Sequence, residues 1–152
     1  MAIRSIILSA SVLVVFAACG RTEAPVHQSG GAVMRNLAVG QVWAYRSRPS
    51  DRGSTLTIGK IEELAASGTV VHVSLTGVHV KNPGVPGGYS SELPHAPFTR
   101  AAIEGSITDL VGQASPPPQF EAGYQEWRKS QGGVFTISVA EAVDFAEKAL
   151  NK

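Results

Sequence analysis

Histidine is the side chain in this sequence best suited to chemistry near neutral pH, because its ordinary pKa lies close to 6.5. The chain has four histidines. Two of them, His72 and His79, fall in one β-rich run, and we expect both on its solvent-exposed face. Their separation along a strand is roughly 20 Å, so they cannot share a metal ion. We predict that both are solvent-facing side chains, available for contact with a ligand or partner.

A third histidine, His95, lies between Pro94 and Pro97 in a long stretch rich in proline and glycine that also contains Tyr89. The flanking prolines restrict the backbone around His95, which makes it the strongest single candidate for a functional contact. Long irregular segments are common places for binding residues. We therefore predict a ligand- or partner-binding surface formed by His95 and Tyr89, with His72 and His79. The alternative is that His95 is an ordinary loop residue.

Sequence signatures of common enzymes and metal sites are absent. The chain contains no Gly-x-Ser-x-Gly, His-Glu-x-x-His or Cys-x-x-Cys motif. The segment Gly53–Ile61 is similar to a phosphate-binding loop, but Ile61 replaces the hydroxyl that would bind magnesium, and the segment falls in a predicted strand. The carboxylate pairs Glu62–Glu63 and Glu141 with Asp144 show no sign of the apolar pocket that acid–base catalysis needs. We expect no catalytic residue, no metal, no cofactor and no enzymatic activity.

The composition excludes further classes of protein. The chain has 152 residues, a net charge of +1 and only 16% charged residues, whereas nucleic-acid-binding proteins usually carry a basic field. With 43% hydrophobic residues it can build a core of modest size. Its single cysteine excludes an internal disulfide framework and a zinc site built on cysteines. We expect one small domain that does not bind nucleic acid.

The N-terminus has the pattern of a secretory signal. Arg4 is followed by the uncharged run Ile6–Ala18, which ends in small residues. As a helix this run would reach roughly 20 Å, less than the ~30 Å hydrocarbon core of a bilayer. A permanent transmembrane helix is therefore the weaker interpretation.

The end of this run, Phe16-Ala17-Ala18-Cys19, resembles the lipobox of bacterial lipoproteins. The resemblance implies that residues 1–18 are removed, that Cys19 is lipidated and anchors the chain in the membrane, and that Gly20 directs it to the periplasmic face of the outer membrane. Phe16 departs from the pattern, in which leucine is usual. An ordinary signal peptidase site near a cysteine is the alternative. Residues 19–36 lack periodicity and contain several Gly and Pro residues, so they are interpreted as a flexible tether.

Residues 37–152 are predicted to form a single domain that begins with strands. Val42–Arg46 is β-rich, and the runs Ser54–Leu64 and Thr69–Val80 flank a short loop as in a hairpin. In the last run the alternation of apolar residues slips by one at Thr76-Gly77, which predicts a β-bulge. Asn82–Pro97 is predicted to be irregular.

Helical signals follow. Thr99 can cap a helix whose apolar face, including Leu110 and Val111, runs on to the prolines at 116–118. An aromatic stripe from Phe120 to Trp127 predicts a second, core-facing helix, and Ser138 with Glu141 forms a capping box for a third. The predicted class is α+β, with a small antiparallel sheet of three to four strands packed against two to three helices.

Three segments of this domain, Gly40–Trp43, Gly53–Ile58 and Gly133–Val143, resemble small uncharacterised bacterial proteins, over about residues 37–150. This resemblance implies a compact domain and carries over no activity. The leading hypothesis is a membrane-anchored envelope lipoprotein that binds an envelope protein, a toxin or a cell-wall component without catalysis. The alternatives are a structural lipoprotein with no dedicated ligand and, less favoured, a small periplasmic enzyme.

Overall fold

The computed structural model describes residues 35–152. The predicted signal, the lipidation site Cys19 and nearly all of the predicted tether lie outside these residues. In the described part of the chain, no helix is long and apolar enough to cross a membrane.

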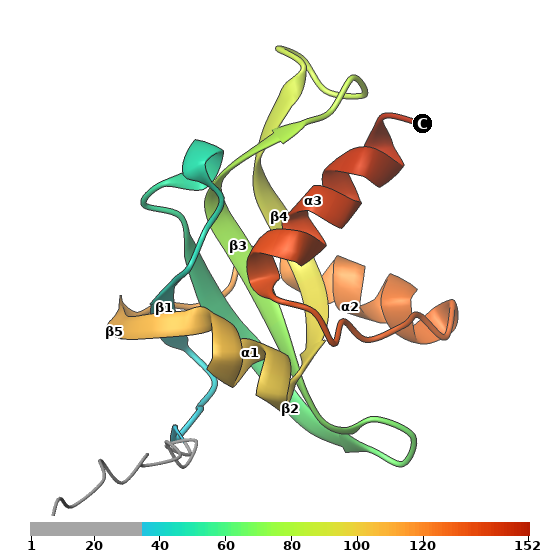
Figure 1. Ribbon diagram of the computed structural model, residues 1–152. Coiled ribbons are helices and arrows are strands. Elements are labelled where there is room, and N and C mark those ends of the chain that lie inside the picture. The colour runs from blue at the N-terminus through green and yellow to red at the C-terminus, as the bar shows by residue number, and fades with distance from the viewer. Residues whose placement is uncertain (1–34) are drawn as a thin grey trace, which may run out of the picture. The chain divides into compact units, whose positions relative to one another are not determined.

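The fold is a five-stranded antiparallel sheet with helices on both faces (Figure 1). The strands lie in the order β4-β3-β2-β1-β5. This confirms the predicted α+β class, although the sheet has five strands rather than three to four. The bounds are β1 Gln41–Tyr45, β2 Thr55–Leu64, β3 Gly68–Lys81, β4 Tyr89–Thr99, β5 Ile107–Gln113, α1 Arg100–Ser106, α2 Gln119–Lys129 and α3 Val139–Leu150, with a short 3-10 helix η1 at Pro49–Asp51.

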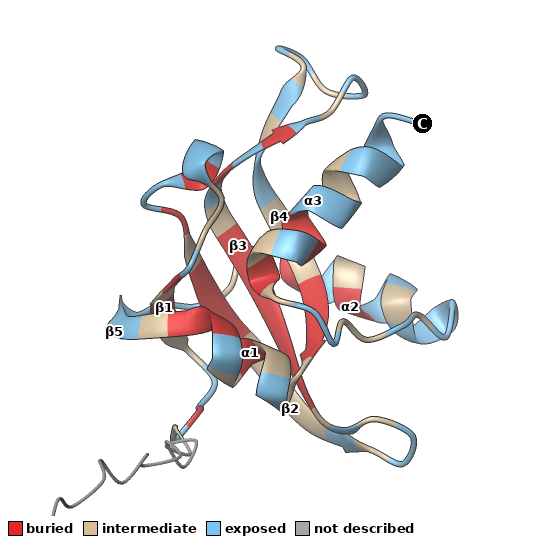
Figure 2. Ribbon diagram, viewed as in Figure 1, coloured by how far each residue is buried: buried red, intermediate tan, exposed pale blue. Residues whose placement is uncertain are grey.

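The main core lies between the sheet and the pair α1 and α3. Val71, Val73 and Leu75, at alternate positions of β3, point into it and belong to the same buried cluster as Ile103 and Val143. Figure 2 shows the resulting band of buried residues along the central strands. Burial of this kind contributes roughly 25 cal/mol per Å² of apolar surface, and it is the dominant stabilising term.

The predicted bulge in β3 is confirmed. Gly77 has φ +75°, and the pairing with β4 shifts between Thr76 and Val80. Glycine adopts this left-handed conformation without a steric penalty. The shift returns Val78 and Val80 to the same core as Val73, so one strand keeps a single apolar face along its whole length.

The prediction of an irregular segment from residue 82 to residue 97 is wrong. The loop ends at Gly88, and the remainder forms β4, which pairs with β3. Because β4 is an edge strand, a proline nitrogen on its outer side removes no hydrogen bond from the sheet. Pro97 fits this rule, since its carbonyl faces outward and accepts a hydrogen bond from the Phe135 N–H.

The predicted first helix is only half correct. Thr99 caps α1 as expected and accepts a hydrogen bond from the Ala102 N–H, but the helix ends at Ser106. The chain then continues as β5, which pairs with the free edge of β1. Leu110 and Val111, predicted to face the core from a helix, are exposed on this edge strand.

The other two predicted helices are confirmed. Ser138 and Glu141 form the capping box of α3, each side chain bonding the other's backbone N–H. In α2 the side chains of Phe120 and Tyr124 are buried. This helix covers the sheet face opposite α1 and α3, and that packing decides the environment of two predicted site residues.

Candidate functional site

The four residues of the predicted binding surface fall into two separate pairs. His79 and Tyr89 stack on each other with ring centroids 4.1 Å apart and planes 16° apart. His72 and His95 meet instead through their ring nitrogens. The structure therefore does not bring all four into one surface.

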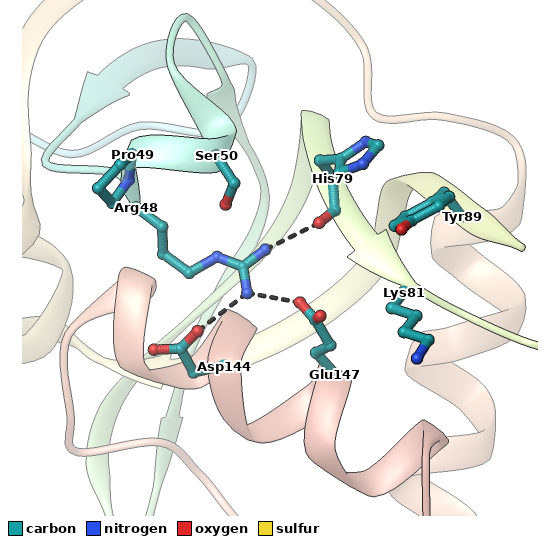
Figure 3. Close-up of a pocket in the computed structure, with 8 residues that line it drawn as sticks. All are labelled: Arg48, Pro49, Ser50, His79, Lys81, Tyr89, Asp144 and Glu147. Carbon is teal, nitrogen blue, oxygen red and sulfur yellow. Dashed lines mark hydrogen bonds and ion pairs between the residues drawn. The ribbon is translucent and has the colours of Figure 1, made fainter.

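The His79–Tyr89 pair lines an open pocket of about 540 Å³ (Figure 3). Its walls come from four elements: the turn at η1, the end of β3, the start of β4 and the outer side of α3. The lining residues are Arg48, Pro49, Ser50, His79, Lys81, Tyr89, Asp144 and Glu147. We call this the Arg48 pocket.

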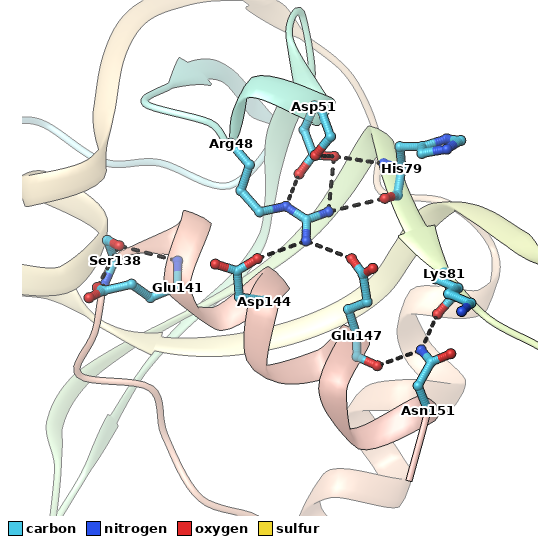
Figure 4. A network of polar contacts seen from close by, with 10 residues as sticks. Arg48, Asp51, His79, Lys81, Ser138, Glu141, Asp144, Glu147 and Asn151 are labelled. Carbon is cyan, nitrogen blue, oxygen red and sulfur yellow. Dashed lines mark hydrogen bonds and ion pairs between the residues drawn. The ribbon is translucent and has the colours of Figure 1, made fainter.

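The Arg48 guanidinium holds the walls of the pocket together. It donates two hydrogen bonds to Asp51, at 2.6 and 3.0 Å, and one each to Asp144, at 2.9 Å, and Glu147, at 2.7 Å (Figure 4). A fifth goes to the His79 carbonyl at 3.1 Å. All five donors of the guanidinium are thus used within the protein, so Arg48 is a structural cation and not a free anion-binding group.

Asp51 is the buried partner in this network, with 1% of its surface exposed. Burial opposes its ionisation, but hydrogen bonds from Arg48 and from the His79 N–H outweigh burial and hold its pKa below the ordinary value. The hydrogen bond to Asp51, together with those to Asp144 and Glu147, raises the pKa of Arg48. Both groups are therefore charged throughout the physiological pH range.

The chemistry that the Arg48 pocket offers is recognition of charge and of ring surfaces. Tyr89 keeps 51% of its surface exposed beside the opening. Asp144 and Glu147 present carboxylates on one side, and Lys81 lies across from them beneath Tyr89 (Figure 3). A partner with charges of both signs and an apolar or planar group would be matched at this surface.

The prediction that His72 faces solvent is wrong. Its side chain is fully buried, as is the neighbouring Ser74, because α2 packs over this face of the sheet. Trp127 and Tyr124 of α2 contact the His72 ring edge-on, with centroids 4.8 and 5.1 Å away. His79, beyond the bulge on the same strand, is exposed as predicted.

His95 also lies in a different place from the prediction. It belongs to β4 and not to a loop, and α2 partly covers it. The Gly123 position of α2 rests on it, since a Cβ added there would lie 2.7 Å from the His95 Cβ. His95 Nε2 lies 2.9 Å from His72 Nδ1, which makes an imidazole–imidazole hydrogen bond.

A carboxylate completes this buried cluster. Glu62 Oε1 lies 3.0 Å from His72 Nε2, without the alignment of a hydrogen bond, and Glu62 accepts a hydrogen bond from the Tyr124 hydroxyl at 3.1 Å. Burial lowers the pKa of His72, and Glu62 opposes this effect. Burial, with repulsion from His72, lowers the pKa of His95 to about 4. Both rings are neutral at neutral pH.

This chain of groups can hold or pass a proton, but His72 exposes no surface to a substrate. Among residues 35–152, no group of three or more His, Cys, Asp or Glu side chains is placed to hold a metal ion. By contrast, the Arg48 pocket is open to solvent. Of the residues that line this pocket, the sequence indicated His79 and Tyr89 as candidates but not Arg48, Lys81 or Glu147. The only local signal was the spacing of Arg48 and Asp51, which suits a turn-bound ion pair.

Comparisons with protein-family models, with curated proteins and with solved structures found no match to this chain.

Proposed function

We propose that this chain is a lipid-anchored protein of the bacterial cell envelope that binds a protein partner without catalysing a reaction. The anchor is Cys19, because it ends the lipobox-like segment Phe16-Ala17-Ala18-Cys19. Each buried methylene of an acyl chain contributes about 0.8 kcal/mol to membrane binding, so the two or more acyl chains of a lipidated cysteine hold a protein stably at the membrane. The partner is an envelope protein, reached from the periplasmic face of the outer membrane.

One observation carries the binding role: the His79–Tyr89 stack beside the open Arg48 pocket. Exposed aromatic side chains at a rigid surface are typical of the residues that contribute most to protein–protein binding. Here the stack and the Arg48 ion pairs hold Tyr89 and its surroundings in place, so little conformational entropy is lost on binding. Carboxylates and an ammonium group within the same pocket favour a partner that also carries charges of both signs.

The test begins with capture of partners from an envelope extract on the immobilised full chain, followed by titration of the protein that is retained. Tyr89→Ala should weaken the binding at least about tenfold, as expected for a central aromatic contact. Leu110→Ala is the matched control, because Leu110 is equally exposed, at 51%, but lies on β5. Its affinity should equal that of the unmodified chain.

Charge provides a second comparison. Lys81→Ser should weaken binding and reduce its dependence on salt, whereas Lys129→Ser, on the exposed side of α2, should change neither. Equal affinities for all four variants would remove the Arg48 pocket from consideration. Absence of any saturable partner would favour the structural role, and a retained cell-wall fragment would replace the protein partner with a saccharide or peptide ligand.

A further inference from the structure

The two faces of the sheet differ in the side chains that they present to the helices packed on them. Against α1 and α3 the sheet presents aliphatic side chains such as Val71, Val73 and Leu75. Against α2 it presents the alternate residues of β3, which are Val70 and the polar His72 and Ser74, all fully buried. This side of the sheet therefore buries polar groups under Phe120, Tyr124 and part of Trp127. The hydrogen bond of His72 goes to His95 of β4, and α2 meets the His72 ring through its aromatic side chains.

The His72–His95 hydrogen bond is the central polar contact beneath α2. It exists only while at least one of the two facing nitrogens carries a lone pair. A first added proton can be shared between the rings and is partly balanced by Glu62. A second proton leaves two N–H groups face to face at the present separation of 2.9 Å, in a site that α2 shields from water.

The other charged groups around this pair do not remove the conflict. Lys60, on β2, adds positive charge beside His72, and its ammonium lies 4.6 Å from the centre of the Tyr124 ring. Arg128, on α2, donates a hydrogen bond to the Tyr124 hydroxyl. Against these stand Glu62 beside His72 and Glu121, on α2, beside His95. The charges of the two basic and two acidic neighbours cancel one another. The two positive charges of a doubly protonated pair therefore remain unbalanced.

The connections of α2 permit it to move without unfolding the sheet. Before α2, the chain is held at Ala114, whose N–H bonds the Gly40 carbonyl, and then passes through three prolines. After α2 come Gln131, at φ 51°, and two glycines, before Phe135 bonds to β4. Each end thus has an attachment to the sheet and a short connection without regular structure, and Figure 1 shows α2 set apart from α1 and α3.

We propose that the His72–His95 pair is a pH-sensitive latch: α2 is docked on the sheet while the pair is neutral and separates from it when both imidazoles are protonated. Separation exposes the aromatic side of α2 and the polar face of the sheet to solvent. The latch is independent of the proposed ligand site, because it shares no side chain with the Arg48 pocket.

Trp127 reports on the latch, because its ring lies against His72. In the full chain with Trp43→Phe, Trp127 is the only indole. Lowering the pH from about 7.5 to about 4 should give a reversible red shift of its emission, with a midpoint below the ordinary histidine pKa of about 6.5. The strand signal in the infrared amide band should persist through this transition.

The His95→Gln change, made in the same background, separates the latch from general acid unfolding. A glutamine amide can donate to His72 Nδ1 but does not titrate. We expect the midpoint to move down by about one pH unit or more. His79→Gln, which removes an exposed histidine, should leave the midpoint unchanged. A transition that is the same with and without His95 would overturn the proposal.

A second measurement needs no variant. Ring resonances of His72 and His95 in the wild-type chain, followed by NMR, should change over the same pH interval as the indole resonance of Trp127. Protonation of both rings while the Trp127 signal stays at its neutral-pH position would also overturn the proposal.

Discussion

Two glycines set how closely α2 approaches the sheet. A Cβ on Gly59 of β2 would collide with the ring of Phe120, and one on Gly123 would collide with His95. Both close approaches are needed, because Phe120 and the His95 ring lie between the helix and the strands. A glycine in a strand or a helix is otherwise unfavourable, so these positions reflect packing and not local preference.

At the scale of single residues, we predict that Gly123→Ala destabilises the protein, although alanine favours helices. The methyl group meets His95 Cβ and backbone, which cannot move as a flexible side chain would, and overpacking of this kind costs about 1–3 kcal/mol. Urea unfolding measures the change.

The matched control is Gly105→Ala in α1, where a Cβ meets nothing within 4 Å. This change should stabilise the protein by about 0.5–1 kcal/mol. An equal gain in stability from both substitutions would contradict the close contact between α2 and β4.

At the scale of elements, one arginine fastens three of them. Arg48 precedes η1 and binds the β3 backbone at His79 as well as two carboxylates of α3. Only Asp51, within η1, is buried with it. A buried, hydrogen-bonded partner should matter more than exposed ones, because water competes poorly for it.

We therefore predict an order of effects within this network. Asp51→Asn should lower the free energy of unfolding by about 1–3 kcal/mol, since it leaves Arg48 without its buried counter-charge. Glu147→Gln should cost less than about 1 kcal/mol, because this carboxylate is 30% exposed. The two values come from urea unfolding at neutral pH. The reverse order would show that α3, and not η1, provides the main support for Arg48.

At the scale of the whole molecule, the buried histidines link stability to pH. The pKa of His95 is about 4 in the folded chain, against about 6.5 when unfolded. Between these values the unfolded chain binds more protons, so the free energy of unfolding falls as the pH falls. The stability from this residue is complete above about pH 6.5 and is lost toward pH 4.

We expect a loss of roughly 1–2 kcal/mol between neutral pH and pH ~4.5, after allowance for the partial exposure of His95. Urea unfolding at a series of pH values measures it. The dependence of the free energy of unfolding on pH should be weaker in His95→Gln and unchanged in His79→Gln. A stability that is constant over this interval would show that the pair is hydrated in the folded protein.

The sequence by itself determined the elements whose signals are local. The hairpin of β2 and β3, the bulge at Gly77, the cap at Thr99 and the capping box at Ser138 all depend on residues within a few positions of one another.

Only the tertiary structure decided the rest. Whether 107–113 continues a helix or forms a strand depends on the free edge of β1, about 65 residues earlier in the chain. The proline-rich β4 is a strand because it occupies an edge. His72 alternates with valines as an exposed residue would, and it is buried because α2 returns from some 50 residues away to cover it. Local periodicity specifies which residues share a face, whereas long-range packing decides whether that face meets water.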